Sequence, residues 1–312
     1  STGTAAVLLS VDSSSLLPQP VFTITKPTTP YVMLWTIGQD GLPVPGLSGA
    51  GTEKTVVFDG DADATLQGFS ISPKLQSGNV AMVLGGQTGS ALADSGQGTS
   101  MITNYLGEAS YMLRMAYDGT SFSIDPNLSK YIGDSSSAFV RGVALDASGN
   151  QYVDGTVFGS GTTDTSQTPV FVTTQGVFGS DSPVVTNGRL LRNTDIFVRK
   201  YAPNGTMTYS GLIGGDGDDF AAGWDHAPTM HFDAFGRPRL DEKAVGSAIA
   251  VDLDGNAYVL GIANSFNFPR TRGVFGETFT PSWVATVTKV SADGKHILYS
   301  THLNTSGSGV LP

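Results

Sequence analysis

The chain contains no cysteine among its 312 residues, so neither disulfides nor thiolate chemistry contributes to its fold or function. Charged residues are scarce as well: they make up 14% of the chain, against roughly 25% in an average soluble domain. The 17 basic residues are outnumbered by 27 acidic ones, which gives a formal net charge of −10. This charge repels a phosphate backbone and excludes nucleic acid as an expected partner.

Long apolar runs are missing too. No uninterrupted hydrophobic stretch reaches the roughly 18 residues of a membrane span, and Ser1 begins no signal peptide. We therefore expect a processed product or an internal part of a precursor, without a membrane span. Glycine, by contrast, is abundant, with 40 residues. Because glycine reaches the positive φ values of tight turns, the composition predicts an all-β chain of many short strands.

Two segments offset by 106 residues repeat one pattern, as Asn150 against Asn256 shows. Residues 142–155 read GVALDASGNQYVDG and residues 248–261 read AIAVDLDGNAYVLG. A weaker third copy has its Gly-Asn pair at Asn79. Each copy is an alternating strand, a Gly-Asn turn and a second alternating strand, which predicts a β-hairpin.

A second predicted hairpin follows each of the three copies. Its turns are Asp118-Gly119, Asn204-Gly205 and Asp293-Gly294. Two hairpins form a four-stranded antiparallel unit, which cannot bury both of its faces alone and is expected to stack on its neighbours. The units so predicted are residues 66–135, 136–220 and 247–312, with an insertion at 221–246.

Further motifs accompany these units. They are Phe266-Asn-Phe268-Pro269, Gly273-Val-Phe275, Lys289 with Ala292-Asp293-Gly294, Tyr299-Ser300-Thr301, Gly176-Val-Phe178, Lys200 and the Gly-Gly-x-x-Asp-Asp stretch that ends at Asp219. Together with the Asp252–Gly261 pattern they resemble the SBBP repeats, a bacterial β-propeller repeat group found mainly in large secreted or surface proteins. The resemblance covers roughly residues 66–309. It implies a β-propeller-like array of four-stranded antiparallel blades with long loop insertions.

About three units are visible, whereas a closed propeller typically has 4 to 8 blades. The array is therefore expected to be incomplete or open, to be part of a larger propeller, or to include a diverged blade within residues 1–65. That N-terminal segment has four apolar stretches separated by Pro- and Gly-rich turns. They fit either a degenerate blade or a small β-sandwich.

The insertion at 221–246 is the most chemically varied segment and the expected place of recognition, because long loops on a rigid scaffold often carry binding. Its His pair, five residues apart and near Pro228, does not match the helical spacing of a zinc site. A loop packed over a blade edge is the alternative. The candidate binding residues are Trp224, His226, His231, Asp233 and Arg237.

Two acidic clusters are candidates for calcium. The first alternates as a calcium loop does at its start, but lacks the glycine and the late glutamate of such a loop. The alternative for the first cluster is a solvated acidic turn. The alternative for the second is that its carboxylates accept hydrogen bonds from N–H groups of turns. The candidate ligands are Asp59, Asp61, Asp63, Asp216 and Asp218, and a similar turn role is expected for Asp252.

Nothing in the sequence singles out a catalytic group: no Gly-x-Ser-x-Gly elbow is present, and the four histidines cannot be joined to a serine and an acid. The pattern favours a non-catalytic structural or adhesive module of a secreted or cell-surface bacterial assembly, which contacts itself or another protein through unpaired edges and loops. Alternatives are a carbohydrate-binding propeller and, with less support, a polysaccharide-acting hydrolase. No cofactor other than calcium is expected.

Overall fold

The computed structural model of this chain is built of β-strands, and no helix occurs among the described residues. The predicted all-β class is thereby confirmed. In this described part, accordingly, no helix has the length and apolar character needed to cross a membrane. The structure describes the backbone of residues 5–11, 31–37, 56–59, 64–71, 80–88, 93–94, 110–117, 122–132, 137–158, 171, 173–178, 194–222, 230–232, 238–240, 248–274 and 283–303.

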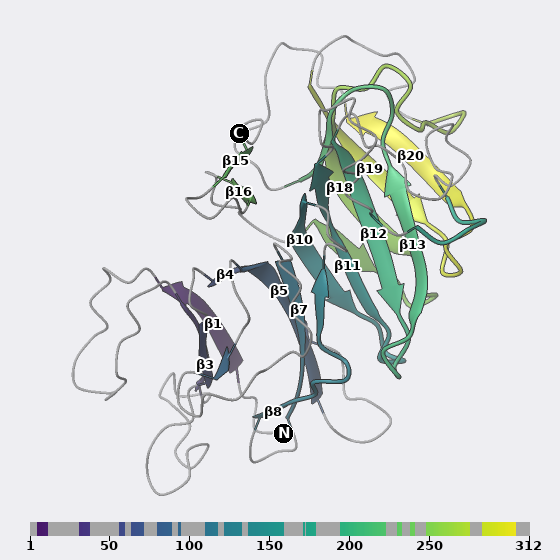
Figure 1. Cartoon of the computed structure of the whole chain (residues 1–312). Coiled ribbons are helices and arrows are strands. Elements are labelled where there is room, and N and C mark those ends of the chain that lie inside the picture. Colours follow the sequence, from purple (N-terminus) through teal and green to yellow (C-terminus); the bar gives the residue numbers. More distant parts are fainter. Residues whose placement is uncertain are drawn as a thin grey trace, which may run out of the picture.

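The strands form four antiparallel sheets of four or five strands and one two-stranded ribbon (Figure 1). Sheet A contains β1 (Ala5–Val11), β2 (Tyr31–Ile37), β3 (Val56–Asp59) and β6 (Ala93–Asp94). Sheet B contains β4 (Ala64–Ile71), β5 (Val80–Thr88), β7 (Ser110–Tyr117), β8 (Phe122–Ile124) and β9 (Lys130–Ile132). Sheet C contains β10 (Ser137–Leu145), β11 (Gln151–Phe158), β12 (Asp195–Tyr201) and β13 (Met207–Ile213). Sheet D contains β14 (Asp219–Ala221), β17 (Ile249–Val251), β18 (Ala257–Ala263), β19 (Val284–Val290) and β20 (Ile297–Leu303).

The predicted hairpins account for these sheets. β10 pairs with β11 and β12 with β13 around the predicted turns, and β17, β18, β19 and β20 pair in the same order in sheet D. β4 and β5 pair in the same antiparallel way, although Asn79 itself lies outside the described residues. β6 (residues 93–94) pairs with β3 of the N-terminal sheet, so sheet A includes residues beyond the predicted boundary at residue 65.

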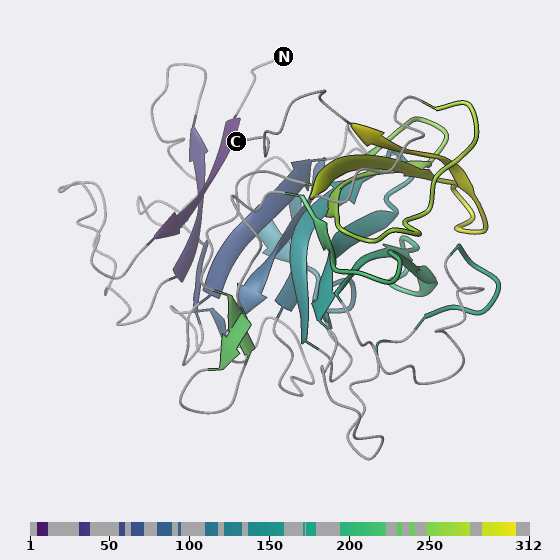
Figure 2. The same cartoon turned by 90° about the horizontal axis from the view of Figure 1, so that it is seen from above.

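Sheets B, C and D lie face to face in chain order (Figure 2). One apolar cluster joins sheet B to sheet C, and a second joins sheet C to sheet D. Sheet C is consequently covered on both faces, and every residue of β12 is buried. In sheet D, by contrast, buried and partly exposed residues alternate along β19, as expected when only one face is covered.

The first strand of each stacked sheet is interrupted at the same place. Gln67 bulges out of β4 and Arg141 out of β10, as the register shifts show. In sheet D the chain leaves after Ala222, whose N–H donates to the Leu260 carbonyl, and returns at Ala248, whose carbonyl accepts from the Leu260 N–H. A bulge places two residues opposite one on the partner strand. In sheet D the whole insertion lies where sheets B and C have a single bulged residue.

This geometry shifts the boundaries of the insertion. The predicted boundary at residue 220 divides β14, leaving Asp219 and Phe220 in the middle unit and Ala221 in the insertion, but the whole strand pairs with β18 in sheet D. The excursion therefore covers residues 223–247, and within it β15 (Met230–Phe232) pairs with β16 (Pro238–Leu240). The sequence missed this because three residues of strand are too short to give a period-2 pattern.

Candidate functional site

A half-buried aspartate, Asp146, organises the turn between β10 and β11. The Oδ1 atom of Asp146 accepts backbone N–H bonds from Ser148 and Asn150, both at 2.9 Å, and its Oδ2 accepts from the Asn150 amide at 2.7 Å. Gly149 closes the turn with φ of 85°, a value that favours glycine. The Asp side chain thus supplies the acceptors that the reversing backbone cannot.

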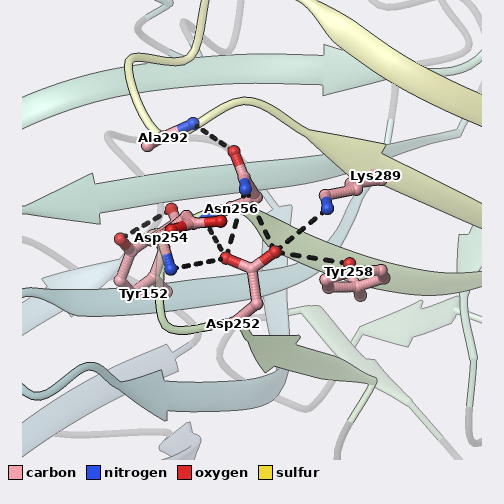
Figure 3. A network of polar contacts seen from close by, with 8 residues as sticks. Tyr152, Asp252, Asp254, Asn256, Tyr258, Lys289 and Ala292 are labelled. Carbon is pink, nitrogen blue, oxygen red and sulfur yellow. Dashed lines mark hydrogen bonds and ion pairs between the residues drawn. The ribbon is translucent and has the colours of Figure 1, made fainter.

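The turn between β17 and β18 has the same construction (Figure 3). Asp252 Oδ1 accepts from the N–H groups of Asp254 at 3.1 Å and Asn256 at 2.9 Å, and its Oδ2 accepts from the Asn256 amide at 3.0 Å. Gly255 has φ of 81°. The predicted role of Asp252 as an acceptor for turn N–H groups is confirmed.

A lysine on the third strand lies over a tyrosine on the second strand in both sheets. Lys200 Nζ is 5.0 Å from the ring centre of Tyr152, and Lys289 Nζ is 4.7 Å from that of Tyr258. Lys289 also forms an ion pair of 3.0 Å with Asp252. Desolvation raises the pKa of Asp252, but hydrogen bonds from Asn256 and Lys289 outweigh it, and the pKa lies well below its usual value.

The equivalent groups of sheet C reach across to sheet D. The hydroxyl proton of Tyr152 is shared between Asp146 Oδ2 at 3.1 Å and the Gly255 carbonyl at 3.0 Å. Lys200 Nζ donates to the Ala292 carbonyl at 2.9 Å, and burial lowers the pKa of Lys200. Arg114 in sheet B makes a similar, longer contact of 3.5 Å with the Gly149 carbonyl. Sheet B thereby contacts a turn of sheet C, and sheet C contacts two turns of sheet D.

Replacing Tyr152 with phenylalanine tests this contact. The substitution leaves the buried Gly255 carbonyl without the hydroxyl, so we expect the free energy of unfolding to fall by about 1–2 kcal/mol in urea titrations. Tyr258→Phe is the matched control, since the contacts of its hydroxyl stay within sheet D, with Asp252 at 3.3 Å and with Lys289, and we expect less than about 0.5 kcal/mol. Equal losses for the two variants would show that the contact between sheets has no energetic role.

The exposed face of sheet D is equivalent to the face of sheet C that packs on sheet D. We define the outer face of sheet D as Tyr258, Leu260, Ile262, Val287, Lys289 and Leu303, which strand register places side by side. Leu260 is 43% exposed and Leu303 40%. The register-equivalent positions in sheet C are Tyr152, Asp154, Thr156, Val198, Lys200 and Ile213, all of which are buried.

Arg141 links the interrupted first strands of three sheets. It is fully buried, and it donates from Nη1 to Gln67 Oε1 at 2.9 Å and from Nη2 to the Ala222 carbonyl at 3.4 Å. Asp154, also fully buried, lies on the neighbouring strand opposite the bulge. Burial raises the pKa of Asp154, and the charge of Arg141 opposes this increase. Sequence reasoning missed Arg141 because nothing in its local pattern marks a bulge.

Of the acidic residues considered for calcium, those between sheets C and D are engaged in backbone contacts. Asp218 Oδ1 accepts from the Thr194 N–H, Asp216 Oδ1 from the Phe266 N–H, and Asp219 from three N–H groups and the Ser265 hydroxyl. Burial raises the pKa of Asp219 to about 6. Across the described residues, no group of three His, Cys, Asp or Glu side chains is placed to hold a metal ion. Calcium binding stays a prediction.

The other sequence-predicted site residues are only partly placed. His231 lies in β15 opposite Arg239, and Asp59 ends β3 opposite Ala93; only their backbone is described. The remaining candidates lie outside the described residues: Trp224, His226, Asp233, Arg237, Asp61 and Asp63. Their predicted roles in binding therefore stay predictions. The structure instead brings together Tyr258, Leu260 and Lys289.

Comparison with known proteins gives no match: no protein-family model fits the chain, and no curated protein matches it in sequence. Function is therefore inferred from the stacked sheets, their turn contacts and the outer face of sheet D.

Proposed function

We propose that this chain is a non-catalytic structural or adhesive module that makes protein–protein contacts in a secreted or cell-surface bacterial assembly. The observation that carries the proposal is the outer face of sheet D. Its side chains occupy the positions that sheet C buries against sheet D, yet Leu260 and Leu303 stay exposed. An exposed apolar surface of this kind marks an interaction site in many proteins.

The stacking of the sheets supports a propeller-like arrangement in this proposal. β10 contacts β4 and β5 on one side and β17 on the other, so the first strands of successive sheets lie near one another. Sheet A and sheet D form opposite ends of the described array (Figure 1). Such an array is open, and its end face is available to a partner. The secreted or surface location is proposed from the SBBP-like motifs.

Self-association of the isolated chain tests this function. With no partner present, apolar outer faces are expected to meet, so the weight-average mass measured by light scattering should rise with protein concentration above that of one chain. Leu260→Asn should keep the chain monomeric over the same range, because it places a polar amide at the centre of the face. Leu253→Asn is the control, since Leu253 is fully exposed on a turn outside the face.

A chain that stays monomeric at every concentration would count against the proposed function. So would association that Leu260→Asn leaves unchanged, since the contact would then use another surface. Circular dichroism of both variants confirms that the strands are intact.

A further inference from the structure

The partner that fits the outer face of sheet D can be specified from the C–D interface. We propose that this face binds a further four-stranded antiparallel sheet built like sheet D, stacked on it as sheet D is stacked on sheet C. This inference rests on the proposed function, because it takes the outer face as a contact surface. It adds the architecture and the polar groups that the partner must present.

The apolar part of the argument is a match of positions. Val198 and Ile213 of sheet C are buried in the cluster shared with sheet D. Strand register makes Val287 and Leu303 their equivalents on the outer face of sheet D. On its covered face sheet D presents small side chains to this cluster, including Ala257, Val259 and Ala263. A sheet with small residues at those places would lie equally flat on the outer face.

The polar part of the argument concerns the two groups that reach across. Tyr152 and Lys200 donate to the carbonyls of Gly255 and Ala292, which belong to the two turns of sheet D. On the outer face their equivalents are Tyr258 and Lys289. An ammonium group has three donors, so Lys289 retains donors beyond its ion pair with Asp252. The partner is thus expected to present turn carbonyls, as an Asp-x-x-Gly-Asn turn does.

The match of donors and acceptors argues against a second outer face as the occupant. A symmetric dimer would bring identical surfaces together, and Lys289 lies within the face at 21% side-chain exposure. Two such faces would bring the donors of Tyr258 and Lys289 toward each other and would offer no turn carbonyl to accept from them. A sheet of the sheet D type instead brings carbonyl oxygens to that position. The continuity of the C–D contact therefore favours a stacked sheet over a second outer face.

A duplication supplies such a sheet within the chain itself. Residues 214–303 are inserted a second time between Leu303 and Asn304, so that the added Gly214 follows Leu303 as Gly214 follows Ile213 in sheet C. Because the chain has no cysteine, Leu260→Cys in the original sheet gives a single thiol at the centre of the face. Thiol labelling is measured at a dilution where light scattering shows one chain per particle.

We expect the duplication to slow labelling of Leu260→Cys on the order of tenfold or more relative to the unduplicated chain. Leu253→Cys, on the exposed turn, should label equally fast in both. Adding Tyr258→Phe to the duplicated chain should restore part of the labelling rate, since the contact with a partner carbonyl is lost. Protection with this pattern supports the proposal.

Folding of the added copy is followed separately by a single Val259→Cys in that copy, because Val259 is buried in sheet D. If Val259→Cys is protected while Leu260→Cys labels freely, the added sheet folds elsewhere and the proposal is overturned. If Val259→Cys and Leu260→Cys both label as fast as Leu253→Cys, the added copy has not folded on the outer face of sheet D, and the proposal is overturned as well.

The self-association experiment separates the two proposals. Suppose that Leu260→Cys labels rapidly in the duplicated chain, while the unduplicated chain still associates through Leu260. The proposed function then stays in place, and the occupant of the outer face is a second copy of the chain. If Leu260→Cys labels rapidly in the duplicated chain and the unduplicated chain never associates, both proposals are contradicted.

Discussion

Replacement of Arg141 with methionine is expected to lower the free energy of unfolding by about 3–5 kcal/mol, the usual cost of removing one partner of a buried charged pair. The substitution leaves Asp154 fully buried without a countercharge. It also removes the donors to Gln67 and to the Ala222 carbonyl. Urea titration at about pH 9, above the pKa of about 8 that burial gives Asp154, measures the effect, provided that the slope of the transition is unchanged.

The pH dependence of this loss has a definite sign. Without Arg141, the folded-state pKa of Asp154 should rise further above its unfolded value. The folded state then binds more protons than the unfolded state, so stability falls as the pH rises. Because burial already raises the pKa of Asp154 to about 8 in the intact chain, the deficit of Arg141→Met should shrink when the pH is lowered from about 9 to about 6. A deficit that grows on acidification would contradict a buried Asp154 charge as its cause.

Sheet D suggests the compensating change. Leu260 occupies the position in sheet D that Asp154 occupies in sheet C. The double variant Arg141→Met, Asp154→Leu should therefore recover most of the lost stability, as apolar replacements of buried ion pairs do elsewhere. If the double variant is no more stable than Arg141→Met, the penalty comes from the lost hydrogen bonds to Gln67 and Ala222 and not from the isolated carboxylate.

Gly155→Ala is expected to be the second severe substitution, with a loss of about 3 kcal/mol. A Cβ atom at Gly155 would overlap the carbonyl oxygen of Phe139 and lie 2.7 Å from Cε1 of Phe197. The oxygen belongs to the backbone of β10 and can move only if the strand moves. Thermal and urea unfolding of the variant measure the loss.

Gly68→Ala is the matched control, because Gly68 follows the bulge of β4 but has room. Its nearest atom would be the Cα of Gly142 at 3.4 Å, an ordinary contact distance. We expect a change smaller than about 1 kcal/mol. Similar losses for Gly68→Ala and Gly155→Ala would mean that the contact with Phe139 is relieved without cost.

The sequence predicted the hairpins well because their determinants are local. An alternating pattern, an Asp at the strand end and a Gly-Asn pair suffice to define the turns at Asp146 and Asp252, including the carboxylate contacts. Phe178 of the repeated Gly176-Val-Phe178 motif is buried in the core between sheets C and D. These features depend on residues close together in sequence, which single-sequence reasoning can use.

Features that depend on distant residues were not predicted. Arg141 contacts residues far away in the chain in both directions, and its bulge has no sequence signature. Exposure of Leu260 follows from the position of sheet D at the end of the described array, whereas the residue alone would indicate burial. The predicted binding residues around Trp224 were chosen for their chemistry, and their predicted role depends on surroundings that sequence does not give.

The break in the first strand of sheet D has a consequence for how such a chain can vary. Pairing with β18 resumes at Ala248 as if nothing had been added, so the sheet does not constrain the length of the excursion after Ala222. Doubling a flexible loop costs only about 0.6 kcal/mol. The position is thus a permissive entry point, where evolution or an engineer can exchange one segment for another while the scaffold beneath is conserved.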